Sequence, residues 1–473
     1  MSVPGLLDHQ RQAVDWIRSK KRGLLGDPPG LGKTRVAIEA FDAPDKRVLV
    51  VAPALVLTGG TWSDELARWA QYPESFTMAP YSMLNARNGS SPNFGTKKNP
   101  KYRLRDEYKG HWDAVIVDEA HYTKGRKTSW TWAVQQLAKN SEYFLEMTGT
   151  PVPNWAHEIF TLLQAVFPER AKPGADLGSY WRWVQRWFVV LPNFQARSEH
   201  AKQIGGLLTC SDECKQLPAW DPCEHYLEFV DANLGDRFLR RRREDCLDLP
   251  EVTTQTVQTP MGRDQKRIYK EFKQDFLAEV DGQEVITWTT GARSVALDRV
   301  TVSDWLVQDP ETRSAIPRGG KFDQLRLDLE SRDRPTVVFA HYRDTVEACA
   351  AVARDLGAKV GVVHGGVGRA KSGEVVKSFK RGEIDVLVGS LETMAEGLQL
   401  TEADVLIMVE VSYKPSRNEQ ARMRVDRMGQ TRPITIREYV TPGTVDERKR
   451  WLLAEKTDQQ LRLMSARDFA EIL

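Results

Sequence analysis

Short apolar runs recur along the chain and alternate with stretches in which apolar residues have helical spacing. Each run spans only a few residues and is rich in β-branched side chains, which is typical of strands buried on both faces of a parallel sheet. The runs cover residues 47–52, 114–117, 143–147, 336–340, 359–363, 385–389 and 405–409. Because the first three runs lie far from the last four, the pattern predicts an α/β protein with two separate parallel sheets.

The sequence between the two sets of strands has a different character. Residues 168–320 are charged, rich in tryptophan and helical in spacing, so we expect an insertion and a linker without a strand series. The 473 residues exceed the size of one hydrophobic core, which stops growing at roughly 250 residues. We predict a first lobe (1–168), a helical insertion (169–250), a linker with the start of a second protrusion (251–320), and a second lobe (321–473) with a closing helix over 444–464.

Composition and charge narrow the class of protein. The 41% hydrophobic and 28% charged residues are close to globular averages, so the chain is expected to fold throughout. A formal net charge of +2 excludes a protein that coats nucleic acid through charge alone. Any DNA contact would therefore come from local basic surfaces.

The chain has the features of a cytoplasmic protein. Its longest apolar run, residues 48–57, is interrupted by Pro53 and is too short to cross a bilayer. The amino-terminal residues lack a basic region followed by an apolar one. Five cysteines, an odd number, do not suggest a disulfide framework. We expect reduced thiols and no membrane partner.

A glycine-rich loop follows the first short apolar run and opens a helical pattern. Gly30 and Gly32 would let backbone N–H groups turn toward phosphate oxygens, and the helix amino terminus adds its positive dipole end. Lys33 would bridge the β- and γ-phosphates of ATP, and Thr34 would hold Mg²⁺. The alternative is a Gly/Pro-rich turn that ends by chance in Gly-Lys-Thr. The candidate nucleotide-binding residues of this loop are Asp27, Pro28, Pro29, Gly30, Leu31, Gly32, Lys33 and Thr34.

An acidic pair, within a DEAH box, ends the predicted strand at residues 114–117. Asp118 and Glu119 would lie at the carboxyl end of a buried strand, where α/β sheets place their binding crevices. Asp118 would hold Mg²⁺ through water, and Glu119 would orient and deprotonate the attacking water. His121 would couple this site to the other lobe. The alternative, an acidic cap on the following helix, loses weight because the pair follows a phosphate loop.

Cys210, Cys214, Cys223 and His225 form a cluster in the predicted insertion. Three thiols and an imidazole have the donor chemistry of a structural Zn²⁺ site. Their spacing is not one of the common zinc spacings, and cysteines in a reduced protein also serve as small apolar side chains. Both interpretations stay open on the sequence alone.

Two further segments invite a DNA-binding interpretation but have simpler ones. Trp183 and Trp187 share one helical face, a spacing that usually indicates core packing rather than a base-stacking platform. The run of arginines at 240–243 has the charge to contact phosphates. We favour internal contacts between lobes for two of these arginines and solvation for the others.

With both nucleotide motifs in place, further segments resemble the SNF2 branch of superfamily 2 helicases in order and spacing. Residues 7–10 resemble the adenine-reading Gln motif, which implies base recognition by Gln10. Asp27 stands where the general phosphate-loop pattern has glycine, and Asp is the usual residue of this family. Residues 50–53 followed by Trp62 to Trp69 resemble the motif that grips the DNA backbone. Leu239-Arg240-Arg241 with Leu249-Pro250 resembles a segment largely peculiar to SNF2 proteins.

The resemblance also assigns coupling and second-lobe residues. Thr148, Gly149 and Thr150, followed by Pro151, resemble the motif that couples hydrolysis to lobe movement. Residues 337–340 resemble the strand that starts the second lobe, and residues 364–366 resemble the next segment. Residues 420–430 match most specifically, which implies coupling by Gln420 and a γ-phosphate contact by Arg424 and Arg427. Their spacing of three would place these arginines on one helical face. The alternative is a solvated Arg/Glu helix face.

Some positions depart from the family pattern. Residues 390–401 are poor in glycine, and Gln399 stands where Asn is usual, which is closer to the annealing-helicase branch. Asp426 replaces the usual His.

The resemblance implies two RecA-like lobes and an ATP-dependent double-stranded DNA translocase that uses ATP and Mg²⁺. Duplex or forked DNA would be held mostly through phosphates, and the chain would work as a monomer with a protein partner as an option. Two rivals remain: a strand-separating or strand-annealing helicase, and a nucleotide-gated clamp that binds DNA structures without moving.

Overall fold

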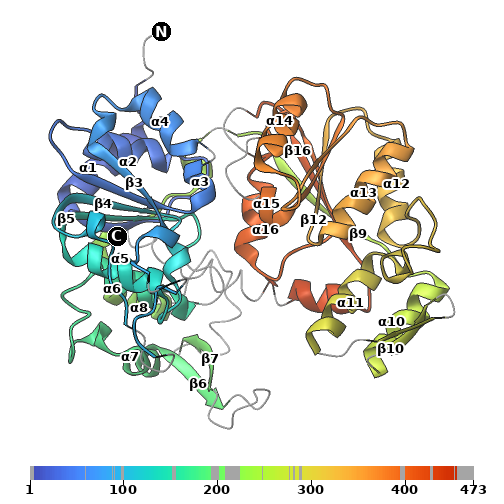
Figure 1. Cartoon of the computed structure of the whole chain (residues 1–473), viewed down its shortest axis with the longest axis horizontal. Coiled ribbons are helices and arrows are strands. Elements are labelled where there is room, and N and C mark those ends of the chain that lie inside the picture. The colour runs from blue at the N-terminus through green and yellow to red at the C-terminus, as the bar shows by residue number, and fades with distance from the viewer. Residues whose placement is uncertain are drawn as a thin grey trace. The chain divides into compact units, whose positions relative to one another are not determined.

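The computed structural model describes residues 5–58, 60–87, 89, 91–96, 101–151, 156–192, 202–207, 224–247, 249–275, 277–280, 283–286, 290–394, 400–426, 430–451 and 453–454. The chain divides into two compact units after Leu247. Each unit is built on a six-stranded parallel sheet with helices packed against it (Figure 1). The prediction of an α/β fold with two parallel-sheet lobes is confirmed.

The first unit contains a sheet in the order β3-β2-β4-β5-β1-β8. Residues of α1, α2 and α4 share one hydrophobic cluster with the sheet, whereas residues of α5 and α6 belong to the cluster on its other face. The strands are β1 (Arg22–Leu25), β2 (Val48–Ala52), β3 (Phe76–Pro80), β4 (Trp112–Asp118), β5 (Ser141–Met147) and β8 (Phe238–Leu239). The helices are α1 (Asp8–Lys20), α2 (Lys33–Phe41), α3 (Ala54–Thr58), α4 (Thr61–Trp69), α5 (Ser129–Lys139) and α6 (Phe160–Val166).

Strand register brings three sequence motifs to one edge of this sheet. Leu25 of β1 pairs with Met147 of β5, and Met147 pairs with Asp118 of β4. Because all three strands are parallel, the segments that follow them leave the sheet side by side. The glycine-rich loop, the acidic pair and the Thr148 segment are therefore neighbours.

The insertion of the first unit combines helices with a hairpin. It contains α7 (Tyr180–Trp187), an antiparallel pair of β6 (Phe188–Pro192) and β7 (Lys202–Leu207), and α8 (Glu224–Asn233). Trp183 and Trp187 are buried, and the Trp183 indole N–H donates to Asn233 Oδ1 at 2.7 Å. The prediction that this tryptophan stripe packs in the core is confirmed.

The second unit contains a sheet in the order β13-β14-β12-β15-β16-β9. Its strands are β9 (Val252–Gln258), β12 (Thr336–Ala340), β13 (Val360–Val363), β14 (Val386–Ser390), β15 (Val405–Met408) and β16 (Ile434–Val440). Its helices are α10 (Arg263–Asp275), α11 (Thr290–Val302), α12 (Lys321–Glu330), α13 (Arg343–Asp355), α14 (Arg369–Lys380), α15 (Leu391–Met394) and α16 (Pro415–Arg422). A hairpin of β10 (Leu277–Val280) and β11 (Gln283–Ile286) lies between α10 and α11 in sequence.

The expectation of no strand series between residues 168 and 320 is wrong. Two strands from this region, β8 and β9, each form an edge of a six-stranded sheet. Six of the seven residues of β9 are exposed, and its sequence, VTTQTVQ, has no continuous apolar run. An edge strand needs few apolar residues, so the search for buried runs did not detect it.

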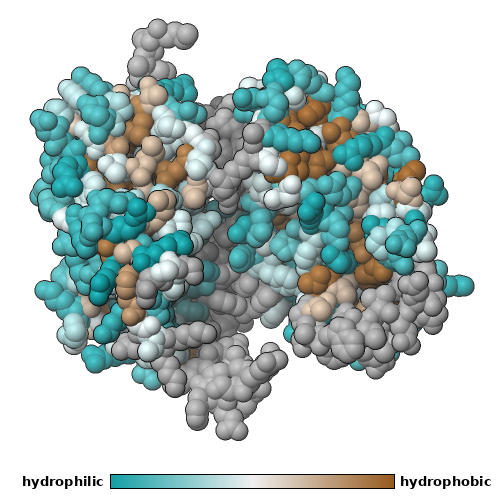
Figure 2. Space-filling view, viewed as in Figure 1, coloured by the Kyte–Doolittle hydropathy of each residue, from teal (hydrophilic) through white to brown (hydrophobic). Residues whose placement is uncertain are grey.

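The outer surface of both units is mainly hydrophilic where the view shows described residues, with smaller apolar areas between (Figure 2). Within the described ranges, no helix has the length and apolarity that a bilayer crossing requires.

Candidate nucleotide-binding site

The glycine-rich loop joins β1 to α2 in the conformation that a phosphate loop requires. Gly30 and Gly32 have φ values of 96° and 81°, in the region where glycine is favoured. Helix α2 begins at Lys33, whose ammonium donates to the carbonyl oxygens of Asp27 at 2.6 Å and Pro28 at 3.3 Å. Thr34 is the next residue of the same helix. The loop therefore presents a helix amino terminus and a lysine whose ammonium is held by two loop carbonyls.

Helix α1 covers this loop through two buried polar residues. Gln10 Nε2 donates to the Leu31 carbonyl at 3.3 Å, and Gln10 Oε1 accepts from the Leu7 N–H. His9 Nε2 lies 3.2 Å from the same carbonyl and must donate, because a carbonyl oxygen only accepts. Burial lowers the pKa of His9, which favours this neutral form. Gln10, predicted to recognise adenine, is placed here as a brace between α1 and the loop.

Asp27 is buried and bound by an arginine from the distant segment after β8. The Arg241 backbone N–H and Nε donate to Asp27 Oδ1 at 3.0 and 3.2 Å, and Arg241 Nη2 pairs with Oδ2. Arg241 also donates to the His9 carbonyl, and Arg240 donates to the Gly26 carbonyl at 3.4 Å. Two of the arginines thus make internal contacts, as expected, and the partners shown for them belong to the phosphate loop and helix α1 of their own unit.

The acidic pair occupies the end of β4 and the residue after it. Asp118 Oδ2 accepts the Trp62 indole N–H at 2.9 Å, and the Asp118 carbonyl accepts the Tyr81 hydroxyl at 2.8 Å. Burial, followed by the neighbouring Glu119 carboxylate, raises the pKa of Asp118 to about 6. Glu119 has a φ of 51°, an uncommon conformation for a residue other than glycine and one that occurs at functional sites.

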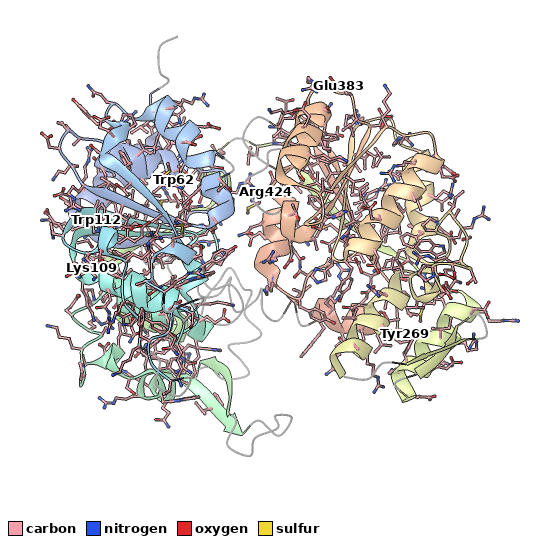
Figure 3. All side chains as sticks on the ribbon, in the orientation of Figure 1. Trp62, Lys109, Trp112, Tyr269, Glu383 and Arg424 are labelled. Atoms are coloured by element: carbon pink, nitrogen blue, oxygen red, sulfur yellow. The ribbon has the colours of Figure 1, made fainter. Side chains whose placement is uncertain are left out.

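Trp62 differs from its expected role in gripping DNA. Its side chain is 0% exposed in the interior of the first unit (Figure 3), so the ring has no surface to offer a DNA backbone. Instead, its N–H orients the carboxylate predicted to hold Mg²⁺. The sequence signal for this role was the spacing of Trp62 and Leu66, which lie four residues apart on the buried face of α4.

Contacts connect the acidic pair to the Thr148 segment. His121 Nδ1 lies 3.2 Å from Glu119 Oε2 and 3.0 Å from Thr148 Oγ1. The Thr148 hydroxyl also accepts the Thr150 N–H at 3.1 Å. Glu119 is therefore connected by polar contacts to the residues predicted to couple hydrolysis to movement.

The Thr148 segment also touches the phosphate loop. A Cβ added to Gly149 would lie 2.6 Å from Pro29 Cδ, so the two backbones approach closely. A Cβ added to Gly32 would lie 2.4 Å from Gln10 Nε2. Larger residues at either glycine would displace a neighbour that shapes the loop.

The combined charges suit a phosphate and a divalent cation. Burial lowers the pKa of Lys33, and the carboxylates of Glu119, Asp27 and Asp118 oppose that shift. Oxygen donors from Asp118 and Thr34 are the ligand type that Mg²⁺ prefers. The residues present therefore fit an ATP–Mg²⁺ complex.

The second unit contains the residues predicted to couple hydrolysis to movement and to contact the γ-phosphate. Gln420 belongs to α16, which ends at Arg422, and buried Arg424 lies in the turn beyond it (Figure 3). We expected Arg424 and Arg427 to lie on one face of a helix. This expectation is wrong, because Arg424 lies in a turn after the end of α16. Arg427 lies outside the described residues.

Most of the cysteine cluster lies outside the described residues. These are Cys210, Cys214 and Cys223, and residues 396–399 of the predicted family segment 390–401 lie outside as well. His225 lies in the first turn of α8. Within the described part of the chain, no group of three or more His, Cys, Asp or Glu residues could hold a metal ion, so no zinc site is supported there.

A phosphate loop, an adjacent acidic pair and a second parallel-sheet unit define a nucleoside triphosphatase with a helicase-like core. The family models agree: the SNF2-related domain matches residues 9–301, and the helicase conserved C-terminal domain matches residues 320–429. The chain belongs to the SNF2-related family and is an SNF2-type ATPase core.

Several known proteins are similar over nearly the whole chain. A SWI/SNF-related matrix-associated actin-dependent regulator of chromatin subfamily A-like protein 1 from Xenopus laevis is 24% identical over 94% of this chain and 42% of its own length. The human DNA annealing helicase and endonuclease ZRANB3 is 22% identical over 93% of this chain and 39% of its own. The chain thus spans about two fifths of these relatives.

A bacterial relative and a solved structure complete the comparison. An uncharacterized ATP-dependent helicase, YqhH, from Bacillus subtilis is 25% identical over 95% of this chain and 78% of its own length. The Sulfolobus solfataricus SWI2/SNF2 ATPase core in complex with dsDNA is 20% identical, covers 98% of this chain and 94% of its own, and has a TM-score of 0.39.

Proposed function

We propose that the chain is an ATP-dependent double-stranded DNA translocase that moves along or remodels DNA or protein–DNA complexes. One observation carries the proposal: Glu119, His121 and Thr148 form a continuous line of polar contacts. The same Thr148 segment packs against the phosphate loop at Gly149 and Pro29. A change at the phosphates would thus reach the predicted coupling segment through direct contacts.

The chemistry follows from the chain's own residues. Lys33 exchanges two loop carbonyls for phosphate oxygens, which are stronger partners for an ammonium. Glu119 accepts a proton from the attacking water, and His121 fixes the direction of its carboxylate. Asp118 and Thr34 would hold Mg²⁺, which when bound neutralises charge on the phosphates. The roles predicted for Gln10, Arg424 and Arg427 belong to this proposal.

The DNA part of the proposal is supported by family membership. The relatives include a regulator of chromatin and a DNA annealing helicase. The small net charge of +2 fits a motor that touches DNA through local surfaces and releases it between steps.

The test is ATP hydrolysis without nucleic acid and then with single-stranded DNA, duplex DNA, forked DNA and RNA at matched phosphate concentration and low salt. Stimulation by duplex DNA that grows with duplex length is expected. A strand-displacement assay beside a triplex-displacement assay then separates translocation from unwinding. Preference for RNA or single strands would move the assignment to a helicase. Low turnover that is insensitive to DNA length would move it to a clamp.

A further inference from the structure

The segment between β3 and β4 forms a two-stranded ribbon on the first unit. Asn85 and Leu104 form an antiparallel bridge. The Ala86 N–H donates to the Arg103 carbonyl at 2.9 Å, and the Arg105 N–H donates to the Leu84 carbonyl at 3.0 Å. Backbone pairing thus fixes the conformation of residues 84–86 and 103–105, which are not part of the six-stranded sheet.

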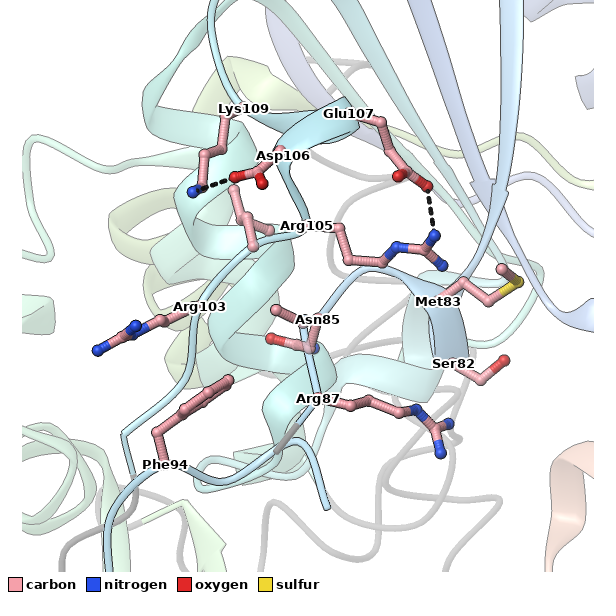
Figure 4. A pocket seen from close by; sticks show the side chains of 12 residues that line it. Ser82, Met83, Asn85, Arg87, Phe94, Arg103, Arg105, Asp106, Glu107 and Lys109 are labelled. Carbon is pink, nitrogen blue, oxygen red and sulfur yellow. Dashed lines mark hydrogen bonds and ion pairs between the residues drawn. The ribbon is translucent and has the colours of Figure 1, made fainter. Parts of the chain in front are cut away.

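The ribbon borders an open pocket of about 680 Å³ whose lining includes Asn85, Arg87, Phe94, Arg103 and Arg105 (Figure 4). This volume lies within the usual range of small-ligand sites, roughly 300–1,000 Å³. We call it the ribbon pocket. It is formed entirely by residues of the first unit, away from the phosphate loop in sequence.

The charge of the ribbon pocket favours an anionic ligand. The lining contains four basic residues and two acidic ones. The two acids pair with two of these basic residues, Asp106 with Lys109 at 2.5 Å and Glu107 with Arg105 at 3.1 Å, so the net charge of the lining is +2. Residues 87–109 contain seven Lys or Arg and two Asp or Glu, a net charge of +5 in a chain whose total is +2. A basic segment of this kind is the signature of a phosphate-binding surface.

The pocket also offers surfaces that a phosphate alone would not use. Met83 is 45% exposed at its wall, and the Arg103 guanidinium lies 4.8 Å from the centre of the partly exposed Phe94 ring. Aromatic rings and guanidinium planes are the groups on which unpaired bases stack. The outside of a closed duplex presents phosphate and sugar, so an apolar, aromatic wall fits an exposed base better.

Asn85 adds an unmet hydrogen-bonding group. Its side chain is among the buried ones, at 3% exposure, and its Nδ2 donates to the Ser129 carbonyl at 3.0 Å. This contact fixes the amide, and its Oδ1 has no hydrogen-bond partner among the described residues. An unmet buried acceptor destabilises a protein, and a donor from a base edge would satisfy it after a small shift of the wall.

We propose that the ribbon pocket binds one unpaired nucleotide of a DNA strand, with the base against Phe94 and Arg103 and the phosphate toward Arg87 and Arg105. The proposal rests on the proposed function and deepens it, because it gives the motor a preference for DNA that contains unpaired bases. A fork offers such a nucleotide beside a duplex. The pocket would therefore recruit the motor to the junction rather than to duplex alone.

The experiment uses the full chain and three DNAs with one common duplex: a blunt duplex, a fork with normal arms, and a fork whose arms are abasic. Abasic arms keep the phosphates and remove the bases. Binding is measured by fluorescence anisotropy, and ATP hydrolysis is measured with each DNA. The wild-type chain should bind the normal fork about tenfold more tightly than the abasic fork, as expected for one stacked base.

The variants are Phe94→Ala, Arg103→Ala and the conservative Phe94→Tyr. Phe94→Ala should remove the roughly tenfold preference for the normal fork, and Phe94→Tyr should keep it, because both rings stack. Lys101→Ala is the matched control, since Lys101 belongs to the same basic segment but does not line the pocket. It should weaken binding to all three DNAs equally or not at all. Hydrolysis without DNA should be unchanged in every variant.

Two outcomes would overturn the proposal. Equal binding of the normal and abasic forks by the wild-type chain would mean that the ribbon contacts phosphates only. An undiminished preference in Phe94→Ala would mean that the base is bound elsewhere. In either case, stimulation by duplex DNA would leave the proposed translocase intact. If no DNA bound to the chain and none stimulated hydrolysis, both the proposed translocase function and the proposed nucleotide binding by the ribbon pocket would be contradicted.

Discussion

Each unit contains a strand, a loop and a helix in succession, β1 to α2 in the first unit and β12 to α13 in the second. The two loops differ in the groups that they bind. In the first unit, the loop between β1 and α2 holds Lys33 through the carbonyl oxygens of Asp27 and Pro28, which a phosphate can replace. In the second unit, the loop between β12 and α13 donates the His341 and Tyr342 N–H groups to Glu410 at 2.8 and 3.2 Å. The second loop therefore already has a carboxyl group from its own unit as partner.

The carboxyl ends of the strands in the second unit form an edge that we call the second edge, and the corresponding edge of the first unit is the first edge. Other charged residues near the second edge are also paired within the unit. Buried Lys321 pairs with Asp446 at 2.6 Å, and buried Lys449 pairs with Asp298 at 3.1 Å. Both units have a parallel sheet. In the first unit this topology supports a candidate nucleotide site, whereas in the second unit the charged side chains at the corresponding edge pair with one another. What differs is the side chain that follows the neighbouring strand, and fold alone does not decide which unit binds ATP.

The largest expected effect tests the chemistry of the first edge. Glu119→Gln removes the proton acceptor while keeping the shape of the side chain, so ATP hydrolysis should fall by about 10²–10⁴-fold. ATP binding, measured with a fluorescent nucleotide, should persist, whereas Lys33→Ala should weaken it. Glu142→Gln, at a surface pair with Lys21, is the control and should hydrolyse ATP normally. Turnover retained in both Glu119→Gln and Lys33→Ala would contradict the assignment of this site.

The buried Asp27–Arg241 pair should be the next largest effect. Asp27→Asn leaves the Arg241 charge without its carboxylate in a largely buried place, which should cost about 3–5 kcal/mol of unfolding free energy. Denaturant unfolding measures the loss, and a double-mutant cycle with Arg241→Ala isolates the pair. The exposed Arg242–Asp245 pair is the matched control. Asp245→Asn should change stability by at most about 1 kcal/mol. Similar losses at the two pairs would show that burial does not matter here.

The buried carboxyl group of Glu410, beside the loop between β12 and α13, predicts a pH dependence. Burial raises the pKa of Glu410 to about 7, against the opposing effects of the His341 N–H, Lys321 and Lys449. The stability contributed by Glu410 is therefore fully present below its unfolded pKa, roughly 4.3, and is lost as the pH rises through about 7. Glu410→Gln should flatten this decline and add up to about 3 kcal/mol to the unfolding free energy at pH 8.

The measurement for Glu410 is thermal or denaturant unfolding of the wild type and the variant at several pH values from 5 to 8. The difference between them should grow with pH. A constant difference would mean that Glu410 is ionised throughout, and the second edge would then resemble a conventional ion-pair cluster.

The smallest effect concerns metal binding at the first edge. Trp62→Phe removes the N–H that orients Asp118, so the Mg²⁺ concentration for half-maximal hydrolysis should rise about tenfold. Hydrolysis at saturating Mg²⁺ should change little. Trp69→Phe, in the same helix but bound to Glu65, is the control. A lowered maximal rate with an unchanged Mg²⁺ requirement would instead indicate a packing role for Trp62.

Much of the fold followed from local patterns, and most of what was missed depends on distant contacts. The seven buried runs became seven of the twelve strands in the two main sheets because a strand buried on both faces must be apolar. The edge strand β9 lacks that constraint and gave no signal. The sequence located Lys33, Asp118 and Glu119 by spacing. It could not show that Asp27 pairs with Arg241 or that Trp62 binds Asp118, because these partners meet only after folding.

The Asp27–Arg241 pair also sets an order of events during synthesis. The two residues are 214 positions apart, and β8, which precedes Arg241, completes the edge of the sheet beside β1. A ribosome adding about 5–20 residues per second exposes the phosphate loop at least about 10 seconds before its arginine emerges. Until then, Asp27 lacks its arginine partner. A fragment that ends near residue 168 would therefore lack both the edge strand β8 and the arginine that binds the phosphate loop.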